Sequence, residues 1–308
     1  MTRDSLPPRP PALAVAAHKG DAGRVVCLTG SRELPGAALL AVGGALRAGA
    51  GLVTLGCLDA ELLALAPVAR PEALLWDLSA GEGFGGLASL ADALYQRAAD
   101  VVLCGPGLGL GQRTGRLVEA LLAGWSGPLV LDADALTELA AEPARLEALR
   151  ARGDDGVTVL TPHPGEAARL LLGLDRLTGE DVPAGDLGRD PVARLRAAER
   201  LASELCAVVV LKGAGTVVHD GERAWICGTG NPGMASGGTG DVLAGIAAAL
   251  LVPHAIQDAD PYDLVRAAVH LHGLAGDRVA ARLGRRALLA GDLLDELGPA
   301  ETEGPWAG

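Results

Sequence analysis

Lysine is almost absent from this chain of 308 residues, since 24 of its 26 basic residues are arginine and only Lys19 and Lys212 are lysine. Its 38 acidic residues give a formal net charge of -12. A surface of this sign offers no basic patch for the phosphates of DNA or RNA, or for an anionic membrane. We therefore expect no nucleic-acid or membrane partner, and an anionic ligand must be held by local groups.

Cysteine pairs and long apolar runs are also missing. The five cysteines are odd in number, widely spaced and form no CxxC pair, which argues against a disulfide framework and against a zinc site. No apolar run reaches the roughly 18 to 20 residues that span a bilayer. The apolar stretch at residues 12–17 is too short for the core of a signal peptide. We expect a cytoplasmic protein.

Hydrophobic residues make up 49% of the chain, glycine contributes 44 residues, and aromatic residues only 2%. Short apolar runs alternate with helix-like segments, and most are apolar on both faces, which is typical of βαβ units. The expected class is α/β, with a mainly parallel central sheet, helices on both faces and a small antiparallel extension. Strands are expected at 24–29, 52–57, 100–104, 128–132, 157–161 and 207–212, with a hairpin at 216–219 and 223–227. Helices are expected at 35–48, 111–123, 133–150, 165–172, 191–205, 241–251 and 262–283.

One catalytic domain over residues 18–300 is the simplest organisation, because no linker divides the chain into two parts of different amino-acid composition. The proline-rich residues 1–17 are expected to form a flexible leader and residues 301–308 a C-terminal tail. Residues 173–190, rich in Gly, Asp and Pro, are expected to form a long loop.

The segment GNPGMASGGTGD, from Gly230 to Asp241, leads directly into an apolar helical run. A glycine-dense turn that opens a helix lets backbone N–H groups converge on an anion, and the helix dipole adds positive potential. A carboxylate beside such an anion hole suggests proton transfer, so Asp241 is a candidate for the base that activates an attacking hydroxyl. The alternative is that Asp241 only caps the helix and the glycines only form a tight turn.

A second segment, VVVLKGAGT, ends a buried strand with Lys212 and small residues. Ligands bind at strand ends of open α/β sheets, and small side chains let a nucleotide approach the backbone there. The spacing is not that of a P-loop. The alternative is a lysine whose amine only extends from a strand end into solvent.

Weaker signals follow three other strands. In TPHPGE, His163 and Glu166 serve either as a turn and a helix cap or as ligand contacts. The GPGLG segment after residue 104 admits a ligand close to the backbone, and Asp132 and Asp134 either cap the next helix or touch substrate. A further pair, His270 and His272, lies two residues apart on an expected helix, so the two rings face different ways and share no metal.

Taken in order, HKG, GS with PGAA, GAGLVT, GPGLG, LDADAL, LTPHPGE, VLKGAGT and GNPGMASGGTGD resemble the ADP-dependent (S)-NAD(P)H-hydrate dehydratase family of the ribokinase-like superfamily. The resemblance runs from about residue 18 to residue 297. It implies repair of a hydrated nicotinamide cofactor: ADP phosphorylates the hydroxyl of the hydrate, and elimination of phosphate regenerates NADH or NADPH, with AMP as the second by-product. Many relatives also carry an NAD(P)H-hydrate epimerase domain, so a separate epimerase is expected as a functional partner, and the family suggests a homo-oligomer, a tetramer or larger.

Motif by motif, the resemblance implies a role for each matching residue. Asp241 takes the hydroxyl proton and contacts the hydrate, whose site is lined by Ala37, Gly107 and His163. Nucleotide and anion-hole contacts fall to Lys212, Gly213, Ala214, Gly215, Thr216, Gly238, Thr239 and Gly240.

Magnesium is expected to accompany ADP. Glu166 stands where many ribokinase-like enzymes place the glutamate of an Asn-x-x-Glu element around magnesium, so it is the candidate metal residue, although His163 replaces the asparagine. Two other functions stay open. One is a ribokinase-like kinase for a vitamin precursor, marked by ATP preference and a stable phosphorylated product. The other is a nucleotide-binding protein without catalysis.

Overall fold

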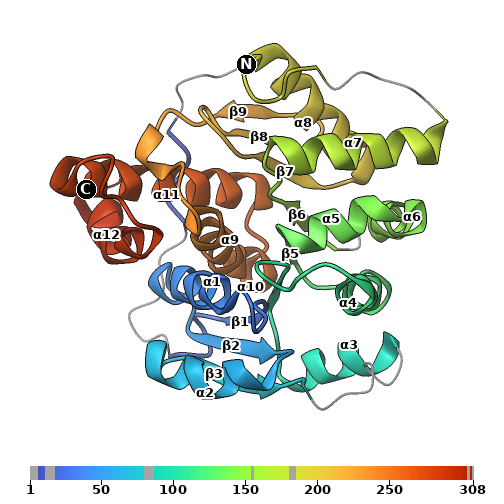
Figure 1. Ribbon diagram of the computed structural model, residues 1–308, viewed down its shortest axis with the longest axis horizontal. Helices are drawn as coiled ribbons and strands as arrows, with labels where there is room; N and C mark the ends of the chain where they lie inside the picture. Colours follow the sequence, from blue (N-terminus) through green and yellow to red (C-terminus); the bar gives the residue numbers. More distant parts are fainter. Residues whose placement is uncertain are drawn as a thin grey trace.

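A computed structural model describes residues 6–10, 18–79, 87–153, 156–179, 185–303 and 306 of the chain. Its centre is a nine-stranded sheet in the order β3-β2-β1-β4-β5-β6-β7-β8-β9 (Figure 1). All neighbouring strands run parallel as far as β7, and β8 and β9 are antiparallel additions. The strands are β1 Arg24–Leu28, β2 Leu52–Cys57, β3 Leu74–Asp77, β4 Val101–Cys104, β5 Leu129–Leu131, β6 Thr158–Leu160, β7 Val208–Leu211, β8 Val217–His219 and β9 Ala224–Ile226.

Twelve α-helices and one short 3-10 helix connect and cover these strands within the described ranges. The first six are α1 Pro35–Arg47, α2 Ala60–Ala69, α3 Leu87–Gln96, α4 Gln112–Gly124, α5 Asp134–Ala141 and α6 Pro143–Arg152. The others are α7 Pro164–Thr178, α8 Pro191–Leu205, α9 Thr239–Leu250, α10 Val252–Gln257, α11 Pro261–Leu283 and α12 Ala290–Glu303, with the 3-10 turn η2 at Pro232–Met234.

Both faces of the sheet are buried, because alternate residues of each strand enter different cores. Val26 and Leu28 of β1 pack into a core with α3 to α8, whereas Val25 and Cys27 pack into a second core with α1, α2, α9 and α11. Figure 1 shows these two groups of helices on opposite sides of the strands. The α/β class with helices on both faces is confirmed.

The strand order reverses between β1 and β4, since the chain first adds β2 and β3 on one side and then β4 to β9 on the other. In open α/β sheets, ligands bind outside the carboxyl ends of the strands at such a switch point. The loops that follow β1, β4, β5, β6 and β7 all leave the sheet at this edge. We therefore expect the functional residues to lie directly after these strands.

All six parallel strands and both hairpin strands expected from the sequence are present, to within a few residues. The expected helix at 133–150 was wrong as one unit, because Pro143 separates α5 from α6. Strand β3 and helices α2, α3, α10 and α12 were not predicted. Four cysteines, Cys27, Cys57, Cys104 and Cys227, are buried and free, and Cys206 is exposed.

The expected loop at 173–190 was wrong over its first residues, because α7 continues to Thr178 and ends with Gly179 in the left-handed conformation, at φ 77°. The glycine at position 173 is there for packing. A Cβ at Gly173 would lie 2.8 Å from a methyl group of Leu146 and 3.0 Å from the carbonyl oxygen of Ala140. Residues 180–184 lie outside the described residues.

Near the chain ends, Trp306 packs its ring 5.2 Å from that of His270 and donates its indole N–H to the carbonyl oxygen of Pro7. Most of the expected leader, residues 1–5 and 11–17, lies outside the described residues, as do residues 304, 305, 307 and 308 of the tail. The domain boundaries stay a prediction. Among the helices that the structure describes, none is long and apolar enough to cross a bilayer.

Candidate active site at the carboxyl edge of the sheet

At the switch point, the loops after β1 and β4 touch. The backbone N–H of Gly30 donates to the carbonyl oxygen of Pro106, and a Cβ at Gly107 would lie 2.7 Å from the Ala37 methyl group and 2.9 Å from the carbonyl oxygen of Leu34. Gly107 also has φ 66°, which favours glycine. The structure thus brings together Ala37 and Gly107, two of the residues expected to line the hydrate site.

The glycine-rich loop after β4 is held by carboxylates of α5. Asp134 accepts a hydrogen bond of 2.8 Å from the N–H of Gly109, and Glu138 accepts one of 2.7 Å from the N–H of Gly111. Helix α5 begins with no side-chain cap, so Asp134 does not have the capping role that the sequence left open for it. These two bonds fix the loop that carries Gly107.

The carboxyl ends of β5 and β7 meet through Asp132 and Lys212. The ammonium Nζ of Lys212 lies 2.5 Å from Oδ1 of Asp132, whose side chain is 1% exposed. Burial lowers the pKa of Lys212, but Asp132 and Glu166 raise it by more, so the amine stays charged. Lys212 is therefore no solvent-directed lysine, and Asp132 is a site residue whose role the sequence did not settle.

His163 and Glu166 form a capping box at the start of α7. Nδ1 of His163 accepts from the N–H groups of Gly165 and Glu166, while Glu166 Oε2 accepts from the backbone N–H of His163 at 2.7 Å. Since Nδ1 is an acceptor, neutral His163 carries its proton on Nε2, which lies 3.2 Å from Glu166 Oε1. The capping interpretation is confirmed, and half of the His163 side chain stays exposed beside this edge of the sheet.

The glycine-rich segment turns into α9 at Gly238, which is the N-cap residue with φ 92°. Asp241 lies in the first turn and is not the cap, so the purely capping interpretation of Asp241 is wrong. The hydroxyl of Thr239 donates to the carbonyl oxygens of Met234 and Ser236 and so closes the turn. The N–H groups of a first helical turn have no partner within the helix, so this turn has the geometry that the expected anion hole requires.

Asp241 is close enough to the Lys212 cluster to share its electrostatics. Burial, and then the negative charge of Asp132, raise the pKa of Asp241 to about 6 against the opposing effect of Lys212. Burial likewise raises the pKa of Glu166 to about 7, against the effect of Lys212. A Cβ on Gly240 would lie 3.4 Å from Lys212 Nζ, which places the ammonium beside the helix N-terminus.

A cavity of about 520 Å³ opens next to this cluster. Seven of the eight residues expected to bind nucleotide line it, namely Lys212, Gly213, Ala214, Gly215, Thr216, Thr239 and Gly240. Gly238 does not; a Cβ there would lie 2.4 Å from Leu40 and 3.0 Å from Ala290. Asn231 also lines the cavity and belongs to the glycine-rich segment singled out from the sequence, whereas sequence reasoning missed Cys227 and the wall from α11, which includes Val269, His272 and Gly273.

One of these missed residues, His272, supports the helix that carries Asp241. Its Nε2 donates to the carbonyl oxygen of Thr239 at 2.9 Å, and burial lowers its pKa to about 4, so the ring is neutral. His270 instead packs against Trp306. The expectation that these two histidines face different ways is confirmed.

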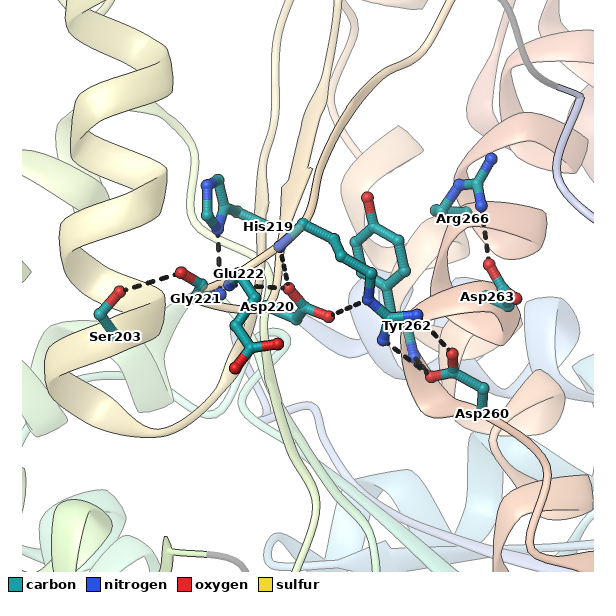
Figure 2. Close-up of polar contacts among 10 residues, drawn as sticks. Ser203, His219, Asp220, Gly221, Glu222, Asp260, Tyr262, Asp263 and Arg266 are labelled. Carbon is teal, nitrogen blue, oxygen red and sulfur yellow. Dashed lines mark hydrogen bonds and ion pairs between the residues drawn. The ribbon is translucent and has the colours of Figure 1, made fainter. Parts of the chain in front are cut away.

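Two walls of the cavity are tied together outside it. Arg223, in the turn between β8 and β9, reaches Asp260 at the start of α11 at 2.6 Å and also contacts Asp220 at 2.7 Å. Its guanidinium lies 4.2 Å from the centre of the Tyr262 ring. Figure 2 shows Asp260 and Tyr262 of α11 facing the turn at Asp220 and Gly221. This clamp sets the position of the hairpin relative to α11.

The donor set at this site does not fit a metal held by the protein. Among the residues that the structure describes, no group of three or more His, Cys, Asp or Glu side chains is arranged around a common point. Both carboxylate oxygens of Glu166 already face donors, from His163 and Lys212. A magnesium ion would therefore depend on the phosphates of a nucleotide for its ligands.

The fold, a mainly parallel sheet with an antiparallel edge, is similar to that of solved kinases. Ribokinase from Cryptococcus neoformans aligns with a TM-score of 0.54 at 14% identity, over 90% of this chain and 99% of its own. Hydroxyethylthiazole kinase from Pyrococcus horikoshii aligns with a TM-score of 0.56 at 18% identity, over 91% and 89%. At these identities the likeness concerns the fold alone, and the fold is ribokinase-like.

The sequence pattern of the NAD(P)H-hydrate dehydratase family matches residues 25–299, and the chain belongs to this family. The ADP-dependent (S)-NAD(P)H-hydrate dehydratase of Bacillus subtilis is 35% identical over 289 residues, which cover 93% of this chain and 92% of that protein. A structure of the ADP/ATP-dependent NAD(P)H-hydrate dehydratase from the same organism, co-crystallised with ATP and Mg²⁺, aligns with a TM-score of 0.73 at 32% identity, over 97% and 94%.

Longer relatives also match. The bifunctional NAD(P)H-hydrate repair enzyme Nnr of Moorella thermoacetica is 41% identical over 298 residues, and that of Escherichia coli is 41% identical over 293. These matches cover 93% and 95% of this chain but 51% and 49% of the relatives. The chain thus spans about half the length of these bifunctional enzymes.

Proposed function

We propose that this chain catalyses the ADP-dependent dehydration of (S)-NADHX and (S)-NADPHX to NADH and NADPH, with release of AMP and phosphate. The observation that carries this proposal is the position of Asp241: it lies in the first turn of α9, next in the chain to Thr239 and Gly240 of the nucleotide cavity, and it feels the charges of Lys212 and Asp132. A carboxylate beside a bound phosphoryl donor can take the proton of an attacking hydroxyl. Membership of the NAD(P)H-hydrate dehydratase family supports the choice of substrate.

The first step moves a phosphoryl group from ADP to the hydroxyl of the hydrate. Asp241 accepts the hydroxyl proton as the oxygen attacks, and with a pKa of about 6 it is ionised at neutral pH, yet basic enough for the transfer. The N–H groups at Gly238, Thr239 and Gly240 and the ammonium of Lys212 stabilise the charge on the moving phosphoryl group. AMP is the product of this step.

The second step eliminates phosphate. Hydroxide is a poor leaving group at neutral pH, whereas phosphate is a good one, and the nitrogen of the nicotinamide ring supplies the electron pair that expels it. Loss of a proton from the neighbouring ring carbon then restores the double bond. The hydrate site beside Ala37 and Gly107 holds the ring, and the half-exposed side chain of His163, whose Nε2–H faces Glu166, lines the same site.

Magnesium is proposed to arrive with ADP and to be held mainly by the nucleotide's phosphates, where it neutralises negative charge. A homotetramer and a cytoplasmic location remain part of the proposal. So does a separate NAD(P)H-hydrate epimerase as functional partner, which the bifunctional composition of the longer relatives supports.

Purified chain incubated with (S)-NADHX and either ADP or ATP tests the proposal. Absorbance at the NADH band is expected to recover, with AMP and phosphate formed in equal amounts when ADP is the donor. A stable phosphorylated product with ATP would indicate the vitamin-kinase alternative. A thermal shift with ADP but no turnover of either hydrate would indicate nucleotide binding without catalysis.

A further inference from the structure

The ammonium group of Lys212 lies between two buried carboxylates. Its Nζ is 2.5 Å from Oδ1 of Asp132 and 4.0 Å from Oε2 of Glu166. The side chains of Asp132 and Glu166 are 1% and 7% exposed, and that of Lys212 is 18% exposed. Solvent therefore does little to neutralise these carboxylates, and the lysine is their main counter-charge.

The three groups come from three neighbouring strand ends. Asp132 follows β5, Glu166 lies in the first turn of α7 after β6, and Lys212 follows β7. These strands are adjacent in the order β5, β6, β7, so Lys212 reaches past the end of β6, where Glu166 lies, to Asp132 at the end of β5. This arrangement is built from the parallel core of the fold and does not depend on a surface loop.

The choice of lysine is itself informative in a chain with 24 arginines and two lysines. A guanidinium is broad and planar, whereas an ammonium is a compact charge with three donor directions. The ammonium also lies against the backbone of α9, since a Cβ on Gly240 would be 3.4 Å from Nζ. Lys212 thus places a compact positive charge beside the two carboxylates.

We propose that the Lys212 ammonium is a built-in cation, which occupies the position between Asp132 and Glu166 where a divalent metal ion would otherwise bind. Carboxylate oxygens are the ligands that Mg²⁺ and Mn²⁺ prefer, so this carboxylate pair would attract such an ion if the lysine were removed. With the lysine present, its positive charge cancels one of the two negative charges and occupies the space between the carboxylates, so the protein alone holds no metal. A divalent ion then enters the site only with the nucleotide.

The same arrangement gives Lys212 a second task. An ammonium has three N–H donors; one is bonded to Asp132, and another is available for a phosphate at the N-terminus of α9, beside Gly240. Asp132 is accordingly a positioning residue, because it fixes the ammonium next to the anion hole. This second task rests on the proposed function, whereas metal exclusion does not.

Binding of Mn²⁺ to the nucleotide-free protein, followed by electron paramagnetic resonance, tests the proposal without any turnover. Wild-type protein is expected to show no saturable binding, and Lys212→Met to bind one Mn²⁺ per chain. The matched control is Lys19→Met, which removes the chain's other, exposed lysine and should behave as wild type. The double variant Lys212→Met with Glu166→Gln should lose the ion again.

Two results would overturn the proposal. One is a folded Lys212→Met variant, verified by near-ultraviolet circular dichroism, that binds no Mn²⁺. The other is saturable Mn²⁺ binding to nucleotide-free wild type that Glu166→Gln abolishes, because it would show a metal site at Glu166 despite the lysine. The second result needs no Lys212 variant, so the proposal stays falsifiable even if Lys212→Met does not fold. All arms omit ADP and hydrate, so failure here is distinct from failure of the dehydratase proposal.

Discussion

Ala37 and Gly107 come from separate loops, yet they lie so close that a Cβ on Gly107 would be 2.7 Å from the Ala37 methyl group. We predict that Gly107→Ala lowers kcat/KM for the hydrate about 100-fold, because an added methyl group displaces the loop by a fraction of an ångström. Affinity for ADP, measured by calorimetry, should stay unchanged. Gly36→Ala is the control, since a Cβ there meets nothing within 4 Å and it lies next to Ala37.

Asp241→Asn should separate catalysis from stability. Turnover should fall by about 10²- to 10⁴-fold, the usual contribution of a general base, while ADP still binds. The fold should gain about 1–2 kcal/mol at pH 8, because burial raises the pKa of Asp241 to about 6 and its charged form is unfavourable in the folded state.

The sign of that stability effect sets its pH dependence. The folded pKa of Asp241 lies above its unfolded value, so the wild type regains stability as pH falls through about 6. The advantage of Asp241→Asn should therefore be full above pH 7 and vanish near pH 4 in urea titrations. If Asp241→Asn is only as stable as wild type at pH 8, burial of the charged Asp241 carboxylate does not destabilise the fold, and this prediction is wrong.

The pH profile of kcat/KM should fall on the acid side near pH 6, since a protonated Asp241 cannot accept the hydroxyl proton. Glu166 has a pKa of about 7 and is the competing assignment. Initial rates between pH 5 and 9 for Glu166→Gln distinguish them. The acid limb should persist in this variant if Asp241 causes it and disappear if Glu166 does.

Arg223→Ala should weaken ADP binding by a few fold, because it removes the clamp between the β8–β9 turn and Asp260 of α11, which positions two walls of the cavity. The loss of stability should stay within about 1 kcal/mol, since half of the arginine side chain is exposed and solvent screens its ion pairs. Arg189→Ala, at an exposed position away from the cavity, serves as the control. Equal ADP affinity in both variants would show that the clamp does not shape the site.

The sequence predicted the parallel core well because each strand is a short apolar run with a clear end. It did not predict β3, whose leucines Leu74 and Leu75 are exposed at the sheet edge and so lack the pattern of a buried strand. Gly173 misled the prediction in the opposite way, since glycine at a helix contact has the same sequence signature as glycine in a loop. In both places the secondary structure depends on where the segment packs in the folded protein, which the local sequence pattern does not indicate.

Some residues of the candidate site could likewise be predicted from the sequence, and others could not. Lys212 was detectable because lysine is rare in this chain, and Asp241 because it follows a glycine-rich turn. The pairing of Lys212 with Asp132 could not be predicted, since 80 residues separate them and only the strand order brings them together. His272 was hidden for the same reason: its contact with Thr239 depends on how α11 packs against α9.

The most direct measurement follows the oxygen of the hydrate. (S)-NADHX prepared in ¹⁸O-labelled water carries the label in its hydroxyl group, and turnover with ADP in ordinary water then reports which bond breaks. Phosphorylation of the hydroxyl followed by elimination predicts that the label appears in inorganic phosphate, with AMP formed in equal amount. Label released into water, or no recovery of NADH with either ADP or ATP, would contradict the proposed function.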